Sequence, residues 1–249
     1  MRRAFFLFGV MVFWLLATHS ALAQSVSIDL GNTDGPGVTG RLVQLTALIT
    51  ILALAPSLLV MVTAFTRIII VLSLLRSALG LQTTPPNMVL IGLALFLTFF
   101  VMQPVLHAAW VSGLLPLEQG RIGNLEGLRQ AAEPFRRFML ANLRPSDLQL
   151  FLDAARLPDP ATSLATPWRA LIPAFLVGEL RRAFEMGFLL YLPFLVIDMV
   201  VSSVLMSLGM MMLPPTAVSL PFKLVFFVLV DGWRLVAGSL VQSFVPPHP

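Results

Sequence analysis

Four ionisable side chains lie inside long apolar stretches of this sequence and are its first candidates for chemistry. Arg67, Asp198, Asp231 and Arg234 stand in runs that are otherwise almost wholly hydrophobic. A charge at the centre of a membrane helix costs about 2.5–3.5 kcal/mol, so each should face protein, water or an opposite charge. Asp231 and Arg234, three residues apart, can pair on one helix. Arg67 and Asp198 can then pair with each other across two helices.

A second group of charges follows the pattern Glu-x-Arg-Arg-x-x-Glu from Glu179 to Glu185. Pairs three residues apart, from Glu179 to Arg182 and from Arg182 to Glu185, explain it as a solvated helix face. A subunit contact is the alternative, with Lys223 as a candidate partner for Glu179. Ion pairs that hold helices together fit these charges better than a proton path, which would need more carboxylates.

The sequence contains no motif that assembles an active site. It has no cysteine, its histidines at 19, 107 and 248 are isolated, and no zinc, phosphate-loop or serine-elbow string occurs. An intramembrane enzyme using Asp198 and Asp231 is the one catalytic alternative, and two lone aspartates support it weakly. We therefore predict no enzyme, no cofactor and no metal.

A run of methionines, Met210, Met211 and Met212, stands directly before Leu213 and a proline pair. Methionine is unbranched and polarizable, so it fills irregular gaps and suits adaptable surfaces. Two interpretations are open: simple gap filling, or a soft apolar ring if several copies of the chain surround an axis.

The composition requires apolar surroundings for most of the chain. Of 249 residues, 57% are hydrophobic and 11% charged, and the mean hydropathy is +0.90. Soluble domains carry about 25% charge, so lipid or other protein must replace water around much of this surface. The net charge of +4 comes from scattered arginines, which gives no reason to expect nucleic-acid binding.

Residues 1–23 have the features of a cleavable signal peptide. Arg2 and Arg3 precede a short apolar run, and Ala21-Leu22-Ala23 is a small-x-small cleavage site. A first membrane helix is the alternative, but it needs about 20 apolar residues. The arginine pair also raises a twin-arginine signal. Residues 24–45, rich in turn-forming residues, are expected to form a flexible external leader.

The rest of the chain is predicted to be all-α. We expect a first helical hairpin over 46–115, a polar helical insert over 116–170, a second helical hairpin over 171–245 and a short tail, 246–249. Apolar runs predict the hairpin helices and helical periodicity predicts those of the insert; the expected helices are Thr46–Leu75, Met88–Leu115, Leu125–Leu143, Ser146–Leu157, Gly187–Leu208 and Val218–Val241.

The two hairpins share a short repeated string at their tips. Gly80 precedes Pro85 and Pro86 by the same spacing as Gly209 precedes Pro214 and Pro215. Glycine suits the end of a helix and proline the start of the next, so each string predicts a tight helix–turn–helix tip, although chance would also produce it. Two spans per hairpin would make a parallel repeat, unlike the inverted repeats of many transporters.

Long runs of the sequence resemble the FliP family of the flagellar type III secretion system. They are Ala64 to Arg76 (AFTRIIIVLSLLR), Thr84 to Met102, Ile172 to Phe175, Leu192 to Asp198 (LPFLVID) and Leu208 to Pro215 (LGMMMLPP). The resemblance covers roughly Arg41 to Phe244; injectisome proteins share this core, and the signal and leader favour the flagellar branch. Gly178 departs from the small polar residue expected before Glu179.

The resemblance implies a subunit of a protein export gate at the flagellar basal body. Such chains form a homo-oligomer, expected to be a pentamer, with FliQ and FliR around a channel for unfolded substrates, above FlhA and FlhB. Met210, Met211 and Met212 match the family's channel gasket, and Glu179 and Lys223 match charged positions at subunit contacts. The expected location is the bacterial inner membrane, partly raised toward the periplasm. A small-solute or ion transporter and a purely structural scaffold are the rival functions.

Overall fold

The computed structural model describes residues 43, 45, 46, 49, 50, 53, 54, 57 and 60–244 except 82, 161 and 211. These residues contain helices, turns and bends but no strand, which confirms the predicted all-α class. The predicted signal peptide and the tail 246–249 lie outside the described residues, as do Met211 and nearly all of the predicted leader. By its internal contacts the chain divides into Met1–Ala53 and Leu54–Pro249, and the helices below belong to the second unit.

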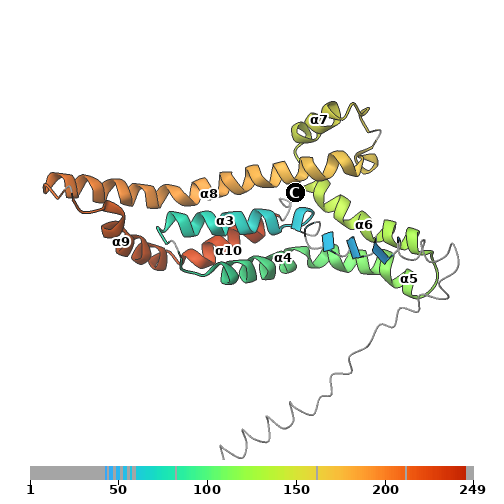
Figure 1. The fold of residues 1–249 in the computed structure, drawn as a ribbon, viewed down its shortest axis with the longest axis horizontal. Coiled ribbons are helices and arrows are strands. Elements are labelled where there is room, and N and C mark those ends of the chain that lie inside the picture. Colours follow the sequence, from blue (N-terminus) through green and yellow to red (C-terminus); the bar gives the residue numbers. More distant parts are fainter. Residues whose placement is uncertain are drawn as a thin grey trace, which may run out of the picture. The chain divides into compact units, whose positions relative to one another are not determined.

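The helices of Leu54–Pro249 follow one another with short connections. α3 spans Phe65–Ala78 and α4 spans Asn87–Ala109, which continues through the π-helical turn η1 (Trp110–Leu114) into α5 (Leu115–Glu118). α6 (Asn124–Ala141), α7 (Pro145–Ala154) and the 3₁₀ turn η2 (Ser163–Ala165) form the polar middle. α8 (Trp168–Ser207), α9 (Pro215–Leu229) and α10 (Gly232–Gln242) complete the chain (Figure 1).

α3 lies inside the main core, between α8 on one side and α4 and α10 on the other (Figure 1). Its fully buried side chains recur three or four residues apart and so form one continuous face: Ile68, Val71, Leu72 and Leu75. α8 approaches α3 closely at Gly187, where an added Cβ would lie 2.2 Å from Leu74 Cδ1. The two helices run in the same direction, so both hairpins point their tips the same way.

The two tips have the same backbone geometry. Gly80 and Gly209 have φ of +76° and +72°, the left-handed conformation that glycine adopts without a Cβ penalty. At each tip the glycine N–H and the following N–H donate to carbonyls of the last helical turn, which is the Schellman motif. Pro86 and Pro214 then occupy the N-cap positions of α4 and α9.

The second tip extends far beyond the first. From the close approach of Gly187 to Leu74, α3 reaches Gly80 after six residues, whereas α8 continues for 22 residues to Gly209. At 1.5 Å per helical residue, the second tip projects about 24 Å further than the first. The free end of the α8–α9 hairpin therefore stands clear of the main core (Figure 1).

Two of the predicted apolar helices are broken. The prediction of one helix over Thr46–Leu75 is wrong, because a turn at residues 62–64 precedes α3. Thr66 Oγ1 donates to the Val60 carbonyl and Thr63 Oγ1 accepts from the Phe65 N–H, so side chains compete there with the helical bonds. The predicted helix Val218–Val241 is instead α9 and α10, which meet at 64°.

Two other boundaries also differ from the prediction. α8 begins at Trp168 instead of Gly187, because the charged stretch from Glu179 to Glu185 is part of the same unbroken helix. The predicted helix Ser146–Leu157 is α7, which begins one residue earlier, at Pro145, with Arg144 as its N-cap residue. Proline suits this first helical position because it has no N–H to leave unpaired.

Among the described residues, two helical stretches are long and apolar enough to cross a membrane. They are Asn87–Glu118 and Trp168–Ser207, and the bent pair Pro215–Leu229 and Gly232–Gln242 makes a third if it counts as one span. Length and composition together place the chain among membrane proteins.

Candidate functional site

Arg67 forms the most deeply buried polar cluster in the described part of the chain. Its side chain is 1% exposed and pairs with Glu179 of α8, which is fully buried. The guanidinium reaches both carboxylate oxygens, with Nε donating to Oε2 at 2.9 Å and Nη2 donating to Oε1. Nη1 donates to the carbonyl and hydroxyl oxygens of Ser243, at 3.0 and 2.9 Å. This cluster joins α3, α8 and the end of α10.

Aromatic rings cover the Arg67 guanidinium. Its central carbon lies 3.7 Å from the centre of the Phe244 ring, which favours the cation electrostatically. Phe244 stacks on Phe138 of α6 at 6.0 Å, and Phe138 meets Phe175 of α8 edge to face at 5.8 Å. These contacts exclude water, so the pair depends on its internal hydrogen bonds.

A second polar cluster lies where α9 meets the end of α3. Lys223 Nζ donates to Asp198 Oδ2 at 2.6 Å and to the Ala78 carbonyl at 3.0 Å. Ser219 Oγ donates to the other carboxylate oxygen of Asp198. Ala78 is the last residue of α3, where a cation also interacts favourably with the helix dipole. The cluster therefore fastens the tip-bearing hairpin to the first hairpin.

The structure changes the predicted pairing of these charges. Within the chain, Arg67 does not pair with Asp198, and Glu179 does not pair with Lys223. Arg67 pairs with Glu179 instead, and Lys223 pairs with Asp198. The reason is the length of α8, in which Glu179 and Asp198 lie 19 residues, or about 28 Å, apart. Glu179 does contact Arg182, at 4.0 Å, but it is no part of a solvated face.

Asp231 and Arg234 do not pair with each other. Both are exposed, and no ion pair joins either to another described residue. Asp231 has φ of +51° at the bend between α9 and α10, which carries its carboxylate out of the regular helix. The adjoining Gly232 is required there, because an added Cβ would lie 2.2 Å from the Phe227 ring.

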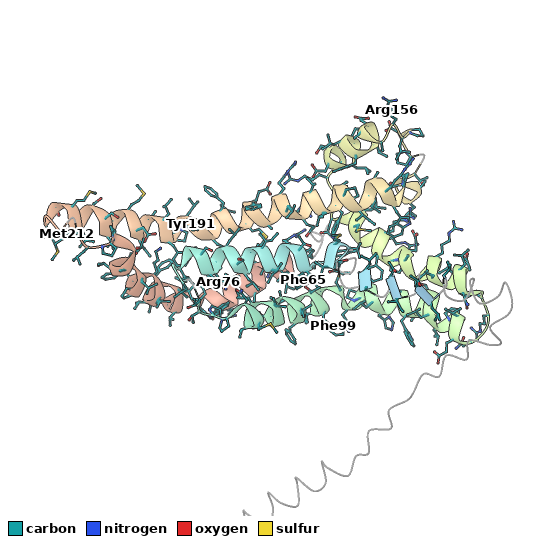
Figure 2. The ribbon with its side chains drawn as sticks, viewed as in Figure 1. Phe65, Arg76, Phe99, Arg156, Tyr191 and Met212 are labelled. Carbon is teal, nitrogen blue, oxygen red and sulfur yellow. The ribbon has the colours of Figure 1, made fainter. Side chains whose placement is uncertain are left out.

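The second tip presents apolar side chains to its surroundings. Met212 is 99% exposed and Met210 is 47% exposed, and Figure 2 shows Met212 at the free end of the long helix. Leu208 and Leu213, on either side, are also exposed. A monomer in water gains nothing from such a cluster, so these residues mark a surface that other molecules cover.

Neither a catalytic nor a metal centre emerges in the part of the chain that the structure describes. No group of three or more His, Asp or Glu there is arranged to hold a metal ion. Asp198 and Asp231, the aspartates of the enzymatic alternative, occupy different environments, one paired with Lys223 and the other exposed at the bend.

The burial of Glu179 was missed by sequence reasoning, although the sequence carries a signal for it. Small or apolar residues recur at every fourth position along this part of α8, and Glu179 stands in that series. Its members are Leu171, Phe175, Ala183 and Gly187. All are buried, which places Glu179 on the face that packs against α3. The arginine pair beside it suggested a solvated face instead.

Asp147 of α7 presents an unsatisfied carboxylate oxygen to Gly178. Its side chain is 4% exposed and pairs with Arg181 through Oδ1 at 3.0 Å, whereas the buried Oδ2 has no hydrogen-bond partner. A Cβ added at Gly178 would lie 3.5 Å from Oδ2, an ordinary contact. The small polar residue expected at position 178 would place a donor there.

Gly178→Ser is therefore expected to stabilise the protein. A serine hydroxyl can donate to Asp147 Oδ2. Replacing glycine with serine inside a helix also adds about 0.5 kcal/mol of helix propensity. We expect the free energy of unfolding to rise by about 1–2 kcal/mol, measured by denaturant titration in detergent. Gly178→Ala is the matched control, because it removes glycine without adding a donor. Alanine gains about 0.5 kcal/mol more than serine from helix propensity alone, so a serine variant less stable than the alanine variant by that amount would contradict this explanation.

These features define a class: an all-helical membrane protein whose buried charges hold helices together and whose exposed apolar tip is a surface for other molecules to cover. A model of the FliP family matches residues 48–240. The chain is 56% identical to the flagellar biosynthetic protein FliP of Caulobacter vibrioides over 226 residues, covering 90% of this chain and 84% of that protein. The proteins of the same name from Rhizobium meliloti and Bacillus subtilis are 50% and 48% identical, over 90% and 87% of this chain and 92% and 98% of theirs. The chain belongs to the FliP family, as its motifs predicted.

Proposed function

We propose that this chain is a non-enzymatic subunit of the flagellar protein export gate, in which the second tip seals a channel for unfolded substrates. Family membership supports the role in flagellum biosynthesis. The observation that carries the sealing role is the second tip itself, which stands about 24 Å beyond the first and exposes Met210 and Met212.

A ring of such tips has the properties that a seal around moving chains requires. Methionine side chains repack at little cost, so a ring of them can close on itself or fit polypeptides of varying shape. An apolar constriction also blocks ions by excluding water when it is empty. We propose that several copies, five in our expectation, surround the channel with FliQ and FliR, above FlhA and FlhB.

The exposed faces of α8 and α9 support assembly with other subunits. Beyond Glu179, α8 exposes a series of large apolar side chains, and α9 exposes others; they include Phe184, Phe188, Leu189, Met199, Val200, Phe222 and Leu229. Glu179 and Lys223 form their ion pairs inside the chain. We propose that they serve subunit contacts indirectly, by holding these helices in the positions that neighbouring subunits meet.

The rival transporter function finds less support in the described residues. A solute path needs polar groups at mid-membrane, whereas the groove between α8 and α9, ≈ 460 Å³, is lined wholly by apolar side chains such as Val200, Val204 and Phe222. Deleting the gene tests the choice directly. We expect loss of filaments and of exported flagellar proteins, with both restored by the native gene in trans; intact filaments in the deletion strain would overturn the export role.

A further inference from the structure

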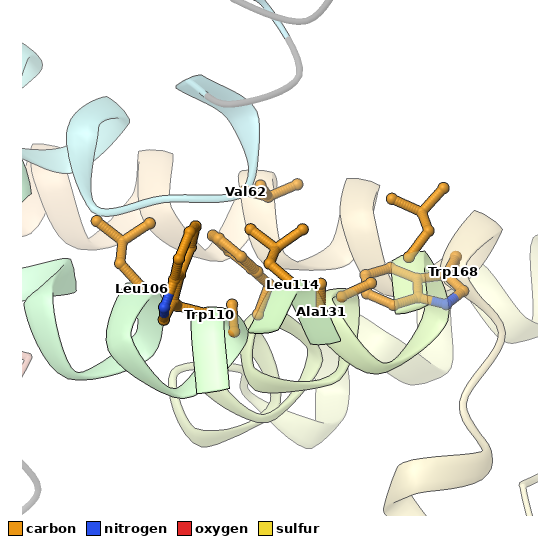
Figure 3. A pocket seen from close by; sticks show the side chains of 10 residues that line it. Val62, Leu106, Trp110, Leu114, Ala131 and Trp168 are labelled. Atoms are coloured by element: carbon orange, nitrogen blue, oxygen red, sulfur yellow. The ribbon is translucent and has the colours of Figure 1, made fainter. Parts of the chain in front are cut away.

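An apolar groove lies where α6 crosses the end of α4 and the start of α8. Its volume is ≈ 600 Å³, within the range of about 300–1,000 Å³ typical of small-molecule sites. Figure 3 shows Leu106, Trp110, Leu114 and Trp168 around it. The ten described residues that line it are all apolar in character, so it favours a hydrocarbon occupant.

A polar pocket of ≈ 510 Å³ adjoins this groove. The two share the lining residues Ala132 and Trp168, so an apolar pocket and a polar pocket meet at these side chains and together make a composite site. The polar part is lined by Arg129, Glu133 and Arg136 and by residues 164–167.

The charges of the polar pocket leave one cation unpaired. Arg136 donates through Nη1 to the carbonyls of Leu164 and Thr166, at 2.9 and 2.7 Å, and lies over the Trp168 ring at 4.4 Å. Glu133 contacts Arg136 at 3.3 Å and Arg137 at 3.9 Å. Arg129 is exposed and has no ion-pair partner among the described residues. The pocket therefore presents a positive charge that no described group neutralises.

Both tryptophans of the site belong to helical stretches that are candidate membrane spans. Trp168 is the first residue of the helix Trp168–Ser207, and Trp110 directly follows α4 in the stretch Asn87–Glu118. Tryptophan is enriched where membrane meets water, because its ring is apolar and its N–H polar. The two tryptophans of the groove therefore suit a site with an apolar part and a polar part.

We propose that this composite site binds a phospholipid with an anionic headgroup, its acyl chain in the groove and its headgroup at Arg129 beside Arg136. Charge complementarity selects this occupant. An acyl chain alone provides no negative charge to pair with Arg129, and a free phosphate leaves the groove empty. The proposal is independent of the export role, because it concerns only the insert and the helix ends that border it.

Quenching of the two groove tryptophans by brominated lipid tests the proposal. The full chain carrying Trp14→Phe and Trp233→Phe keeps only Trp110 and Trp168. It is titrated in detergent with phosphatidylglycerol or phosphatidylcholine brominated on the acyl chains. We expect saturable quenching, half complete at about fivefold less phosphatidylglycerol, which corresponds to about 1 kcal/mol for one basic residue at an anionic surface.

Variants assign the effect to each part of the site. Arg129→Gln should abolish the preference for phosphatidylglycerol, while Arg121→Gln, a nearby exposed arginine outside the pocket, should keep it. Ala132→Phe should block the junction and remove saturable quenching; Leu128→Gln, at an exposed lining position, provides a second test if Ala132→Phe folds poorly. Equal quenching by both lipids, or Arg129→Gln without effect, would overturn the proposal. So would a purified oligomer without saturable quenching, because a neighbouring copy would then cover the groove.

Discussion

Replacing Arg67 with methionine is expected to lower the free energy of unfolding by about 3–5 kcal/mol, the usual cost of breaking a buried ion pair by removing one partner. The variant leaves the Glu179 carboxylate buried without its cation and leaves both Ser243 oxygens without the donor they have now. The expected result is a large loss of folded protein, measured as the midpoint of thermal unfolding in detergent and as recovery from membranes.

Two further variants separate the ion pair from the packing around it. Arg67→Met combined with Glu179→Leu removes both charges, and such replacements are often neutral or stabilising, so most of the lost stability should return. Arg144→Met removes one partner of the exposed pair with Glu185, whose side chains are 42% and 52% exposed. It should cost less than about 1 kcal/mol. Arg67→Met with native stability would refute the structural role of the cluster.

The helices that the sequence placed best are those with a clear apolar length or periodicity. α4 and α6 agree with the prediction to within a few residues at most boundaries, because a long apolar run or a repeated apolar face leaves little choice of structure. The glycine–proline strings likewise predicted where α3 and α8 end, because left-handed glycine is a local requirement of the turn.

The partners of the buried charges were beyond the reach of sequence reasoning. Ion pairing between helices depends on their relative position along the helix axis, and no local sequence pattern specifies this register. The tip strings suggest aligning Gly80 with Gly209, which would place Arg67 near Asp198; the packed helices are offset by about 24 Å from that alignment. Arg67 therefore meets Glu179, and Lys223 of α9 reaches Asp198 instead.

The bend between α9 and α10 illustrates a different limit. The apolar run from Val218 to Val241 is long enough for one helix, and Asp231 gave no warning of a break because aspartate also occurs inside helices. Aspartate tolerates the left-handed conformation better than most residues, and Gly232 admits the Phe227 ring beside it. Long-range packing decided between two conformations that the local sequence allows.

Replacing Met210, Met211 and Met212 together with alanine is expected to make the assembled gate leak. If the tips form the proposed seal, alanine removes the long side chains from its constriction, and water and ions can enter where a ring of methionines would exclude them. A fall of about 1.4 kcal/mol in the barrier to entry already raises permeation tenfold, and we expect at least this effect. Assembly should persist, because the second tip is exposed and contributes little to the core of its own subunit.

Matched replacements show whether the effect belongs to the tip. Met199 and Met206 are 62% and 60% exposed but belong to α8, so replacing both with alanine should leave the permeability unchanged. Replacing the three tip methionines with leucine keeps an apolar ring of similar volume and should preserve the seal. A leak in the Met199 and Met206 variant would assign the effect to general damage of the helix.

The most direct test of the proposed gate is the ion conductance of the purified, assembled complex in a planar bilayer, compared between the native chain and the Met210, Met211 and Met212 alanine variant. The proposal predicts a closed native complex and an alanine complex of equal subunit composition that conducts at least about tenfold more. Equal conductance in two fully assembled complexes would contradict the sealing role of the second tip and leave the chain as a structural scaffold.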